Sequence, residues 1–255
     1  MSFIRGDGLR KVYDPDGNAV EALHNVNFKI EKGQFVSILG PSGCGKSTLL
    51  MMCGGLEEIT EGRLEIGDMP MTGPRREIGV MFQDPTLLPW KTVLQNVLFP
   101  ARIAGIPIDP VRQRARALLK ACGLQNFEAH RPHQLSGGMR QRVSICRALV
   151  NDPEILLMDE PFSALDAITR DQMNLLLLDL WQQQTARTAL FITHSIREAV
   201  LLSDRILMMT RRPATIVEDV AVPFARPRHP ELGEDVEFNR LCSRLRGMIE
   251  HDHGD

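Results

Sequence analysis

Residues 40–47 read Gly-Pro-Ser-Gly-Cys-Gly-Lys-Ser, and the segments on either side of them decide the fold. The apolar run 35–39 before them is typical of a short buried strand, and Leu-Leu-Met-Met at 49–52 is typical of the first turns of a helix. A strand, a glycine-rich turn, Lys-Ser and a helix, in this order, predict a phosphate-binding P-loop. A chance glycine turn, the alternative, would explain neither the strand nor the helix.

The predicted loop can hold a triphosphate through its backbone. Gly43 and Gly45 let several N–H groups point into one cavity, and a helix that begins near Lys46 adds its positive N-terminal end. The Lys46 ammonium group can reach the β- and γ-phosphates, and the Ser47 hydroxyl can bind Mg²⁺. We therefore predict that a nucleoside triphosphate binds at Gly40, Pro41, Ser42, Gly43, Cys44, Gly45, Lys46, Ser47 and Thr48.

The composition limits the classes of partner. The chain has 255 residues and a formal net charge of −2, and its acids and bases are mixed along its length. It contains no lysine- or arginine-rich block, so we expect no nucleic-acid partner. Its N-terminus is too short and polar for a signal peptide, and no apolar run approaches the roughly 18 residues that span a bilayer. A membrane role would therefore come through a partner.

The cysteines give a second constraint. The five are scattered, with no CxxC pair and no histidine at ligand spacing, which favours reduced structural thiols. Cys44 is the exception, because it stands inside the P-loop. We expect that its turn leaves the thiol free and that its oxidation or alkylation blocks nucleotide binding.

The N-terminal and middle segments predict two subdomains around the loop. Short β-like pieces, among them 3–5 and 9–13, fill the first 38 residues and favour an antiparallel β subdomain. From about 90 to 150 the pattern turns helical, with a helix expected at 112–122, and prolines interrupt it. We interpret this stretch as a helical subdomain inserted into an α/β core.

The C-terminal half completes that core. Apolar runs at 155–158 and 189–193 are typical of parallel strands buried on both faces, and 172–183 has the pattern of a helix between them. The fold class is thus α/β, a P-loop NTPase core with the two subdomains described above. We expect this domain to span 1–225, followed at 226–255 by an amphipathic helix and a polar tail.

Two acids close the first of these strands. In open parallel sheets, ligands bind beyond the carboxyl ends of the strands, where Asp159 and Glu160 would lie. Beside a P-loop they have separate tasks. Asp159 would hold Mg²⁺ through water or Ser47, and Glu160 would orient and deprotonate an attacking water. A solvated acid pair at a strand end is the alternative.

A second anion site is predicted at 135–141, Leu-Ser-Gly-Gly-Met-Arg-Gln. Ser136 is a good helix N-cap, and Gly137 and Gly138 open the helix with exposed N–H groups. The P-loop already wraps the triphosphate, so one nucleotide cannot easily use both sites of one chain. A two-fold, head-to-tail pair solves this, with Ser136 of one subunit over the γ-phosphate held by Lys46 of the other. The alternative is an ordinary helix cap.

At this point the chain resembles the ATP-binding subunit of the ABC transporter family, from about residue 3 to 225 and with every motif in family order. Residues 40–47 match Walker A, 135–141 match the signature motif, and 155–159 match Walker B with Glu160 at the catalytic position. The resemblance implies ATP and Mg²⁺ as ligands. It further implies roles for Tyr13 (stacking on adenine), Gln83 (Q-loop, contacting Mg²⁺ and the attacking water), Asp166 (D-loop) and His194 (H-loop, reaching the γ-phosphate).

Two positions depart from the family. Ser195 stands where an aspartate commonly follows the histidine, which puts the local contacts of His194 in doubt. Cys146 replaces a small alanine on the signature helix, and we interpret it as packing.

The resemblance also implies partners. After the Q-loop, Leu87, Leu88 and Trp90 lie in the segment that receives a short coupling helix of a membrane permease in this family, and exposed apolar side chains suit that contact; burial of Trp90 in the helical subdomain is the alternative. The Leu-Leu-Pro-Trp run is similar to the nitrate/sulfonate/taurine importer branch. The resemblance further implies a homodimer, two permease subunits, a periplasmic solute-binding protein, and a peripheral position on the cytoplasmic face of the inner membrane.

The solute stays open, because the ATPase subunit does not touch it. We favour a sulfonate or taurine, then nitrate or a related oxyanion, then a pyrimidine precursor or another small organic solute. Two other classes compete. A soluble ABC ATPase without a transport role usually has two cassettes or a long coiled-coil insertion, and a P-loop kinase or GTPase would lack the signature motif.

Overall fold

The computed structural model describes residues 2–14, 17–182 and 187–251. Its strands are β1 (Ser2–Tyr13), β2 (Val20–Glu31), β3 (Phe35–Leu39), β4 (Glu61–Ile66), β5 (Met69–Pro70), β6 (Ile78–Met81), β7 (Ile155–Asp159), β8 (Thr188–Ile192), β9 (Arg205–Met209) and β10 (Ile216–Ala221). Its α-helices are α1 (Lys46–Cys53), α2 (Val93–Val97), α3 (Phe99–Ile103), α4 (Ile108–Ala121), α5 (Gly137–Leu149), α6 (Ala167–Gln182), α7 (Ile196–Leu202) and α8 (Val236–His251).

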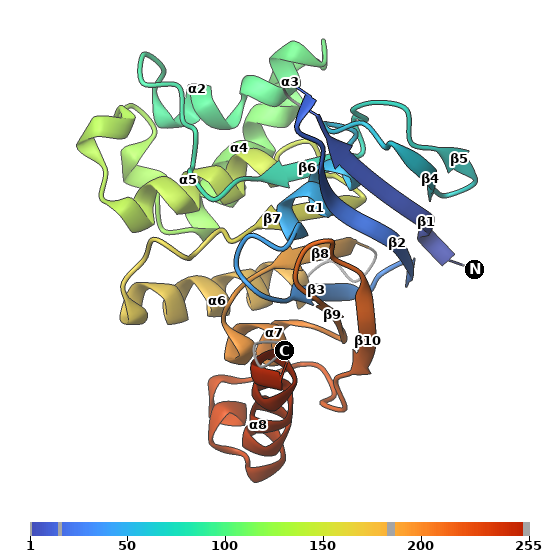
Figure 1. The fold of residues 1–255 in the computed structure, drawn as a ribbon. Coiled ribbons are helices and arrows are strands. Elements are labelled where there is room, and N and C mark those ends of the chain that lie inside the picture. Colours follow the sequence, from blue (N-terminus) through green and yellow to red (C-terminus); the bar gives the residue numbers. More distant parts are fainter. Residues whose placement is uncertain (1, 15–16, 183–186, 252–255) are drawn as a thin grey trace.

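The central sheet has the strand order β10-β9-β3-β8-β7-β6 and is parallel except for the edge strand β10 (Figure 1). Successive residues of β7 face opposite sides. Leu156 and Met158 join the apolar core beneath the helices α4, α5 and α6, whereas Ile155 and Leu157 join the core around α1 and the smaller sheet. Both faces of the strand are thus buried, which explains its uninterrupted apolar run.

The smaller sheet, β2-β1-β4-β5, is antiparallel and packs over α1. The expected pieces 3–5 and 9–13 are one continuous strand, β1, because Gly8 has a φ of +58° and the pairing with β2 shifts register between Gly6 and Leu9. A glycine adopts that backbone angle at little cost, so the strand bends without ending.

The helical region lies along one side of the central sheet and contains α2 to α5 (Figure 1). The helix expected at 112–122 begins earlier, at Ile108, because Pro110 falls in the first turn, where its missing N–H costs nothing. The α/β fold class with an antiparallel β subdomain and helices is confirmed. The division at 225/226 stays a prediction, and the expected polar tail at 252–255 lies outside the described residues.

At the other end of the chain, α8 packs on α7, and Phe238, Cys242 and Leu245 bury the apolar face of the helix. Within the described residues, no helix is both long and apolar enough to cross a bilayer.

Candidate functional site

The loop between β3 and α1 has a backbone that its glycines make possible. Gly45 has a φ of +130°, and a Cβ there would lie 3.0 Å from the Ala22 carbonyl oxygen and 2.9 Å from Leu23 Cδ2. Lys46, only 5 % exposed, donates from Nζ to the carbonyls of Gly40 (3.0 Å) and Pro41 (2.8 Å). Because these acceptors are neutral, the ammonium charge remains available to an anion.

The first residue after that lysine contacts the end of β7. Ser47 Oγ donates to Asp159 Oδ1 over 3.0 Å. Burial raises the pKa of the Asp159 carboxyl, the Ser47 hydrogen bond opposes the rise, and the nearby Glu160 charge adds to it. The hydroxyl and the carboxylate are hard oxygen ligands of the kind Mg²⁺ takes together with phosphate oxygens and water. The described residues contain no cluster of three or more His, Cys, Asp or Glu that could hold a metal ion.

Glu160 and His194 meet where β7 and β8 end. His194 Nδ1 lies 3.3 Å from Glu160 Oε2. The Glu160 N–H donates to the Ile192 carbonyl (3.0 Å), and the Glu160 carbonyl accepts from Ser163 Oγ (3.0 Å). Glu160 has a φ of +42°, an unusual angle for a residue with a Cβ. A base and a histidine in hydrogen-bond reach can together orient one water molecule.

Gln83 contacts the Glu160–His194 group through Ser163, and it is held by Gln141, a residue that sequence reasoning missed. The Gln83 Nε2 donates to Ser163 Oγ over 3.2 Å, and the Gln83 backbone carbonyl accepts from Gln141 Nε2 over 3.1 Å. Gln141 is buried on α5 and also donates to the Pro161 carbonyl. Its place in the Leu-Ser-Gly-Gly-Met-Arg-Gln run was the signal that could have found it. It connects α5 to the segments that follow β6 and β7.

Tyr13 and Arg212 border the P-loop from two other elements. The Tyr13 hydroxyl lies 3.3 Å from Thr48 Oγ1, and the Lys11 ammonium group lies 4.7 Å from the centre of the tyrosine ring. Arg212 Nε donates to the Gly43 carbonyl over 2.7 Å. Sequence reasoning missed this contact because 169 residues separate the two partners.

The predicted second anion site stands apart from the first. Ser136 caps α5 by accepting from the Met139 N–H (3.3 Å), and both Ser136 and Gly137 are exposed. A cleft of about 460 Å³ is lined by Gln83, Gly137 and Leu165 among others. Within the described residues, no hydrogen bond joins Ser136 to residues 40–47. The N-terminus of α5 therefore remains open to a partner.

Comparisons with known proteins decide the family. A sequence profile described as "ABC transporter" matches residues 23–163, which is more than half of the chain. The chain belongs to the ABC transporter family. It is 47 % identical to the taurine import ATP-binding protein TauB of Burkholderia pseudomallei over 226 residues, which covers 89 % of this chain and 86 % of that protein. It is 45 % identical to an uncharacterized ABC transporter ATP-binding protein of Methanocaldococcus jannaschii, covering 93 % of this chain and 88 % of that protein.

A solved structure agrees with these relatives. The chain superposes with a TM-score of 0.77 and 34 % identity on a dimeric, post-hydrolysis ATP-binding cassette bound to ADP and Pi, covering 87 % of this chain and all of the other. The chain is an ATPase of the ABC type.

Two further positions of this ABC ATPase lie at helix starts. Asp166 caps α6, accepting from the Thr169 N–H (3.0 Å) and from the Thr169 hydroxyl (2.7 Å), and these hydrogen bonds lower the pKa of the carboxyl. Ser195 caps α7, accepting from the Glu198 N–H over 3.4 Å. Serine and the aspartate that the resemblance leads us to expect at this position are both good N-cap residues.

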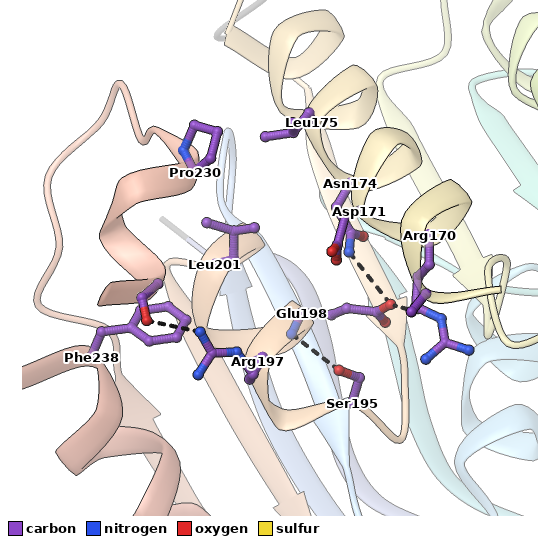
Figure 2. A pocket seen from close by; sticks show the side chains of 12 residues that line it. Arg170, Asp171, Asn174, Leu175, Ser195, Arg197, Glu198, Leu201, Pro230 and Phe238 are labelled. Atoms are coloured by element: carbon purple, nitrogen blue, oxygen red, sulfur yellow. Dashed lines mark hydrogen bonds and ion pairs between the residues drawn. The ribbon is translucent and has the colours of Figure 1, made fainter. Parts of the chain in front are cut away.

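Ser195 and Glu198 also line a cleft of about 410 Å³ between α6, α7 and residues 230–238 (Figure 2). Burial raises the pKa of the Glu198 carboxyl, and hydrogen bonds from Thr193 and Asn174 oppose that rise. The first turns of the helices α6 and α7 line this cleft through Ala167, Arg170 and Arg197.

The apolar segment after the Q-loop is only partly outward-facing. Trp90 is 67 % exposed. Leu87 packs against the helical core, and Leu88 is half-buried, with its N–H and carbonyl bonded to the amide of Asn96 (2.8 and 3.2 Å). The alternative that Trp90 belongs to the core is therefore wrong, and the outward patch consists mainly of this one ring.

The expectation that the P-loop turn leaves the Cys44 thiol free is also wrong. Its side chain is only 2 % exposed and packs in the core around α1, because the turn points it inward, next to Gly40. Burial raises the pKa of the thiol. A buried, protonated thiol reacts slowly, so its modification is not an easy route to a blocked P-loop.

Proposed function

We propose that the site residues act as one half of a composite ATPase centre, with Mg²⁺-ATP between two copies of the chain. The observation that carries the proposal is the arrangement at the ends of β7 and β8, where Asp159 contacts Ser47 and Glu160 lies beside His194. The first pair contacts the loop directly, and the second follows the same strand end; within the described part of the chain Lys46 Nζ donates only to neutral carbonyls, so a phosphate in the loop would meet metal ligands, a cation and a base together.

The chemistry is an in-line attack of water on the γ-phosphate. Glu160 accepts the proton of the water, and His194 and Gln83 hold that water and the γ-phosphate in line. Lys46 stabilises the negative charge that develops on the phosphoryl oxygens. Ser47 and Asp159, together with Gln83, would hold Mg²⁺, which supplies further charge neutralisation when it is bound. Tyr13 stacks on the adenine beside Thr48.

The second copy completes the centre. Ser136, Gly137 and Gly138 of one subunit cover the γ-phosphate held by the other, and Asp166 lies at the contact between the two subunits. The exposed N-terminus of α5 supports this proposal, and so does the dimeric state of the solved cassette described above. ATP binding closes the pair and hydrolysis reopens it.

We further propose that the pair drives import of a small sulfonate such as taurine. The similarity to taurine import ATP-binding proteins over most of the chain supports this solute, and the outward Trp90 supports docking of a permease helix, to which the half-buried Leu87 and Leu88 of the same segment would contribute. The protein would lie on the cytoplasmic face of the membrane, and a periplasmic protein would deliver the solute. Nitrate, a pyrimidine precursor or another small organic solute, and a soluble role without transport, are the competing outcomes.

The test is reconstitution of the chain with its permease in liposomes, with the solute-binding protein on the side of the membrane opposite to the ATPase. We expect ATP-dependent accumulation of labelled taurine, and no accumulation with Glu160→Gln. Uptake of nitrate or a pyrimidine precursor in place of taurine would overturn the solute assignment alone. ATP turnover without any permease association would favour the soluble role.

A further inference from the structure

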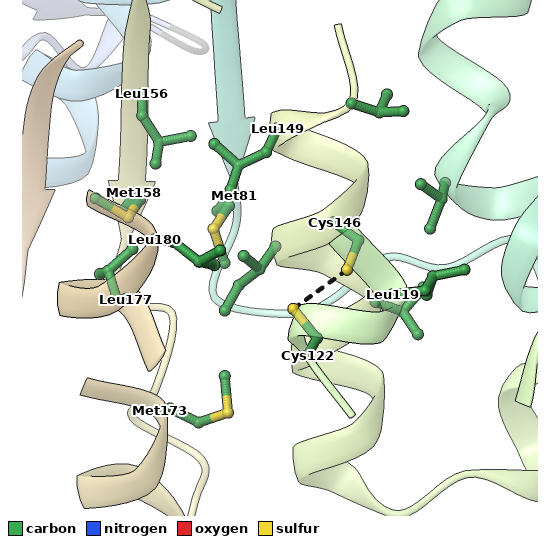
Figure 3. Close-up of a cluster of buried hydrophobic side chains, with 14 of the residues drawn as sticks. Met81, Leu119, Cys122, Cys146, Leu149, Leu156, Met158, Met173, Leu177 and Leu180 are labelled. Atoms are coloured by element: carbon green, nitrogen blue, oxygen red, sulfur yellow. Dashed lines mark hydrogen bonds between the residues drawn. The ribbon is translucent and has the colours of Figure 1, made fainter. Parts of the chain in front are cut away.

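Two buried cysteines lie in contact where α4 ends against α5. Cys122 caps the C-terminus of α4, Cys146 lies inside α5, and their Sγ atoms are 3.4 Å apart (Figure 3). Cys122 is 2 % exposed and Cys146 is fully buried, and Leu119 and Leu149 lie near them. Among the five cysteines, all within the described part of the chain, these two alone share a hydrogen bond between sulfur atoms.

We propose that Cys122 and Cys146 form a site of reversible covalent modification, at which a peroxide converts the two thiols into a disulfide that joins α4 to α5. The proposal does not depend on the function proposed above, because it concerns two thiols outside the nucleotide loop. The proposal also gives Cys146 a chemical role, where the sequence alone suggested only packing.

The two thiols are chemically unequal. The Cys146 thiol donates its hydrogen bond to the Cys122 sulfur. This hydrogen bond lowers the pKa of Cys122, burial opposes the change, and the Arg142 guanidinium lowers the pKa further. Arg142 is held there by a hydrogen bond from Nη1 to the Cys122 carbonyl (3.3 Å), and among the residues that the structure describes its buried Nε has no hydrogen-bond partner. Cys122 is therefore the thiol that ionises and is oxidised first.

The reaction balances in two steps. The Cys122 thiol first releases its proton, its thiolate attacks one oxygen of hydrogen peroxide, and the O–O bond breaks to give a sulfenic acid and hydroxide, which takes up the released proton as water. Cys146 sulfur then attacks the Cys122 sulfur, and its proton and the sulfenic hydroxyl leave as water. In sum, two thiols and one peroxide give one disulfide and two waters.

Little movement is needed to form the bond. The sulfur atoms must close from 3.4 Å to about 2.0 Å. Cys122 stands at a helix end and is followed by Gly123, whose φ is +69°, so the chain can adjust there more easily than inside α5. Because the peroxide must reach a buried pair, we expect reaction to proceed through local opening of the end of α4.

The test exposes the full-length protein to hydrogen peroxide, blocks the remaining thiols with N-ethylmaleimide, and analyses the peptides by mass spectrometry. We expect a cross-linked species that contains Cys122 and Cys146 and lacks two hydrogens, formed in preference to oxidation of Cys53 or Cys242. A disulfide across this stretch restricts the unfolded chain, so the melting temperature should rise by several degrees, on the order of 5 °C, and return after dithiothreitol.

Two variants make the result decisive. Cys146→Ala should remove both the cross-link and the thermal shift, and peroxide should then leave Cys122 as a sulfenic or sulfinic acid. Cys53→Ala, the matched control at another fully buried cysteine, should retain both. Recovery of Cys122 and Cys146 as two separately alkylated or separately oxidised residues in the parent protein would overturn the proposal. A thermal shift that persists in Cys146→Ala would overturn it equally.

Discussion

Glu160 shows how a single residue can be placed at a cost in stability. Its φ of +42° belongs to the left-handed region, where a residue with a Cβ costs of order 1–3 kcal/mol. The backbone is fixed there from both sides, by the hydrogen bond to the Ile192 carbonyl and by the one from Ser163. The result is a carboxylate that lies beside His194. Such strain at a strand end fits a residue selected for chemistry rather than for folding.

The strain can be measured by removing the side chain. Glu160→Gly relieves the unfavourable angle, and we expect the free energy of unfolding to stay the same or rise by up to about 1 kcal/mol, while hydrolysis is lost. Ala117→Gly is the matched control, because Ala117 lies exposed in the helix α4 and its replacement by glycine should cost about 1 kcal/mol. Urea unfolding of the three proteins gives the comparison. An equal loss in both variants would contradict strain at Glu160.

Tyr13 tests the adenine contact. Stacking on an aromatic ring contributes roughly 1–3 kcal/mol per base, so Tyr13→Ala should weaken ATP binding by about 5- to 150-fold. Tyr13→Phe keeps the ring and loses only the hydroxyl contact with Thr48, so its affinity should stay within about threefold of the parent. Calorimetric titration with ATP measures both. Parent-like affinity of Tyr13→Ala would show that adenine binds elsewhere.

Cys53 gives a prediction at alkaline pH. Burial raises the pKa of this thiol from 9.0 to about 12, so the folded protein keeps a proton that the unfolded chain loses. Stability from this thiol is fully present below pH 9 and falls as the pH rises toward 12, by about 1.4 kcal/mol per unit. Cys53→Ala lacks this loss. Its destabilisation relative to the parent in urea should therefore shrink by about 1.4 kcal/mol between pH 8 and pH 10; a difference that does not change with pH would contradict the prediction.

The residues next to the P-loop could be predicted to different degrees. Lys46, Ser47 and Asp159 were accessible to sequence reasoning because their order along the chain already implies a strand, a loop and a second strand end. Arg212 was not, since its contact with Gly43 depends on how the β9–β10 connection folds back over the loop. The direction of the Cys44 side chain was not predictable either, because a turn motif fixes the backbone and leaves the burial of a variable position open.

At the scale of elements, the segment that leads from the Q-loop into α2 holds itself rigid. Thr92 and Gln95 form a reciprocal cap at the start of α2, and Arg147 of α5 donates to the carbonyls of Pro85 and Thr86. Asn96 adds bonds to Leu88. Since the segment is anchored on both sides, its one exposed ring is presented in a fixed place, which lowers the entropy cost of binding a partner.

The exposed aromatic side chain of this segment is Trp90. Trp90→Ala should weaken association with the permease by roughly 30-fold or more, as for a central aromatic contact, and leave ATP hydrolysis by the isolated subunit unchanged. Val217→Ala is the matched control, because Val217 is also largely exposed (63 %) but lies on the edge strand β10. Pull-down with detergent-solubilised permease measures association. Loss of hydrolysis in isolated Trp90→Ala, or intact association, would contradict a docking role.

Helices and strands could be predicted from the sequence where the apolar residues follow a single pattern. The buried strands β3, β7 and β8 are short apolar runs, and α5 and α8 repeat apolar residues at helical spacing. The short helices α2 and α3 were not predicted, because segments of five residues hold too few turns for a periodic pattern. The continuity of β1 was missed because a glycine with positive φ looks the same in sequence whether it ends a strand or bends it.

The whole molecule is organised as three apolar clusters around one sheet. One lies under the helices α2 to α6, one joins the smaller sheet to α1, and the third gathers α7, β9, β10 and α8. The P-loop belongs to the second cluster and the start of α5 to the first. Two halves of a nucleotide site that rest on separate cores can be joined by a second copy of the chain without deforming either core, which a dimer requires.

Mixing two defective variants tests that arrangement. In the Glu160→Gln background, Lys46→Ala removes the phosphate contact and Ser136→Arg fills the space over it, so neither variant alone should dimerise with ATP. In a mixture, each mixed pair contains one site in which both Lys46 and Ser136 are intact. We therefore expect ATP-dependent dimers to reappear on mixing, with about one bound nucleotide per dimer, as measured by analytical ultracentrifugation and nucleotide extraction. Glu160→Gln alone sets the upper limit. If Lys46 and Ser136 of the same chain formed the site, every copy in the mixture would remain defective, and the mixture would sediment like its separate components.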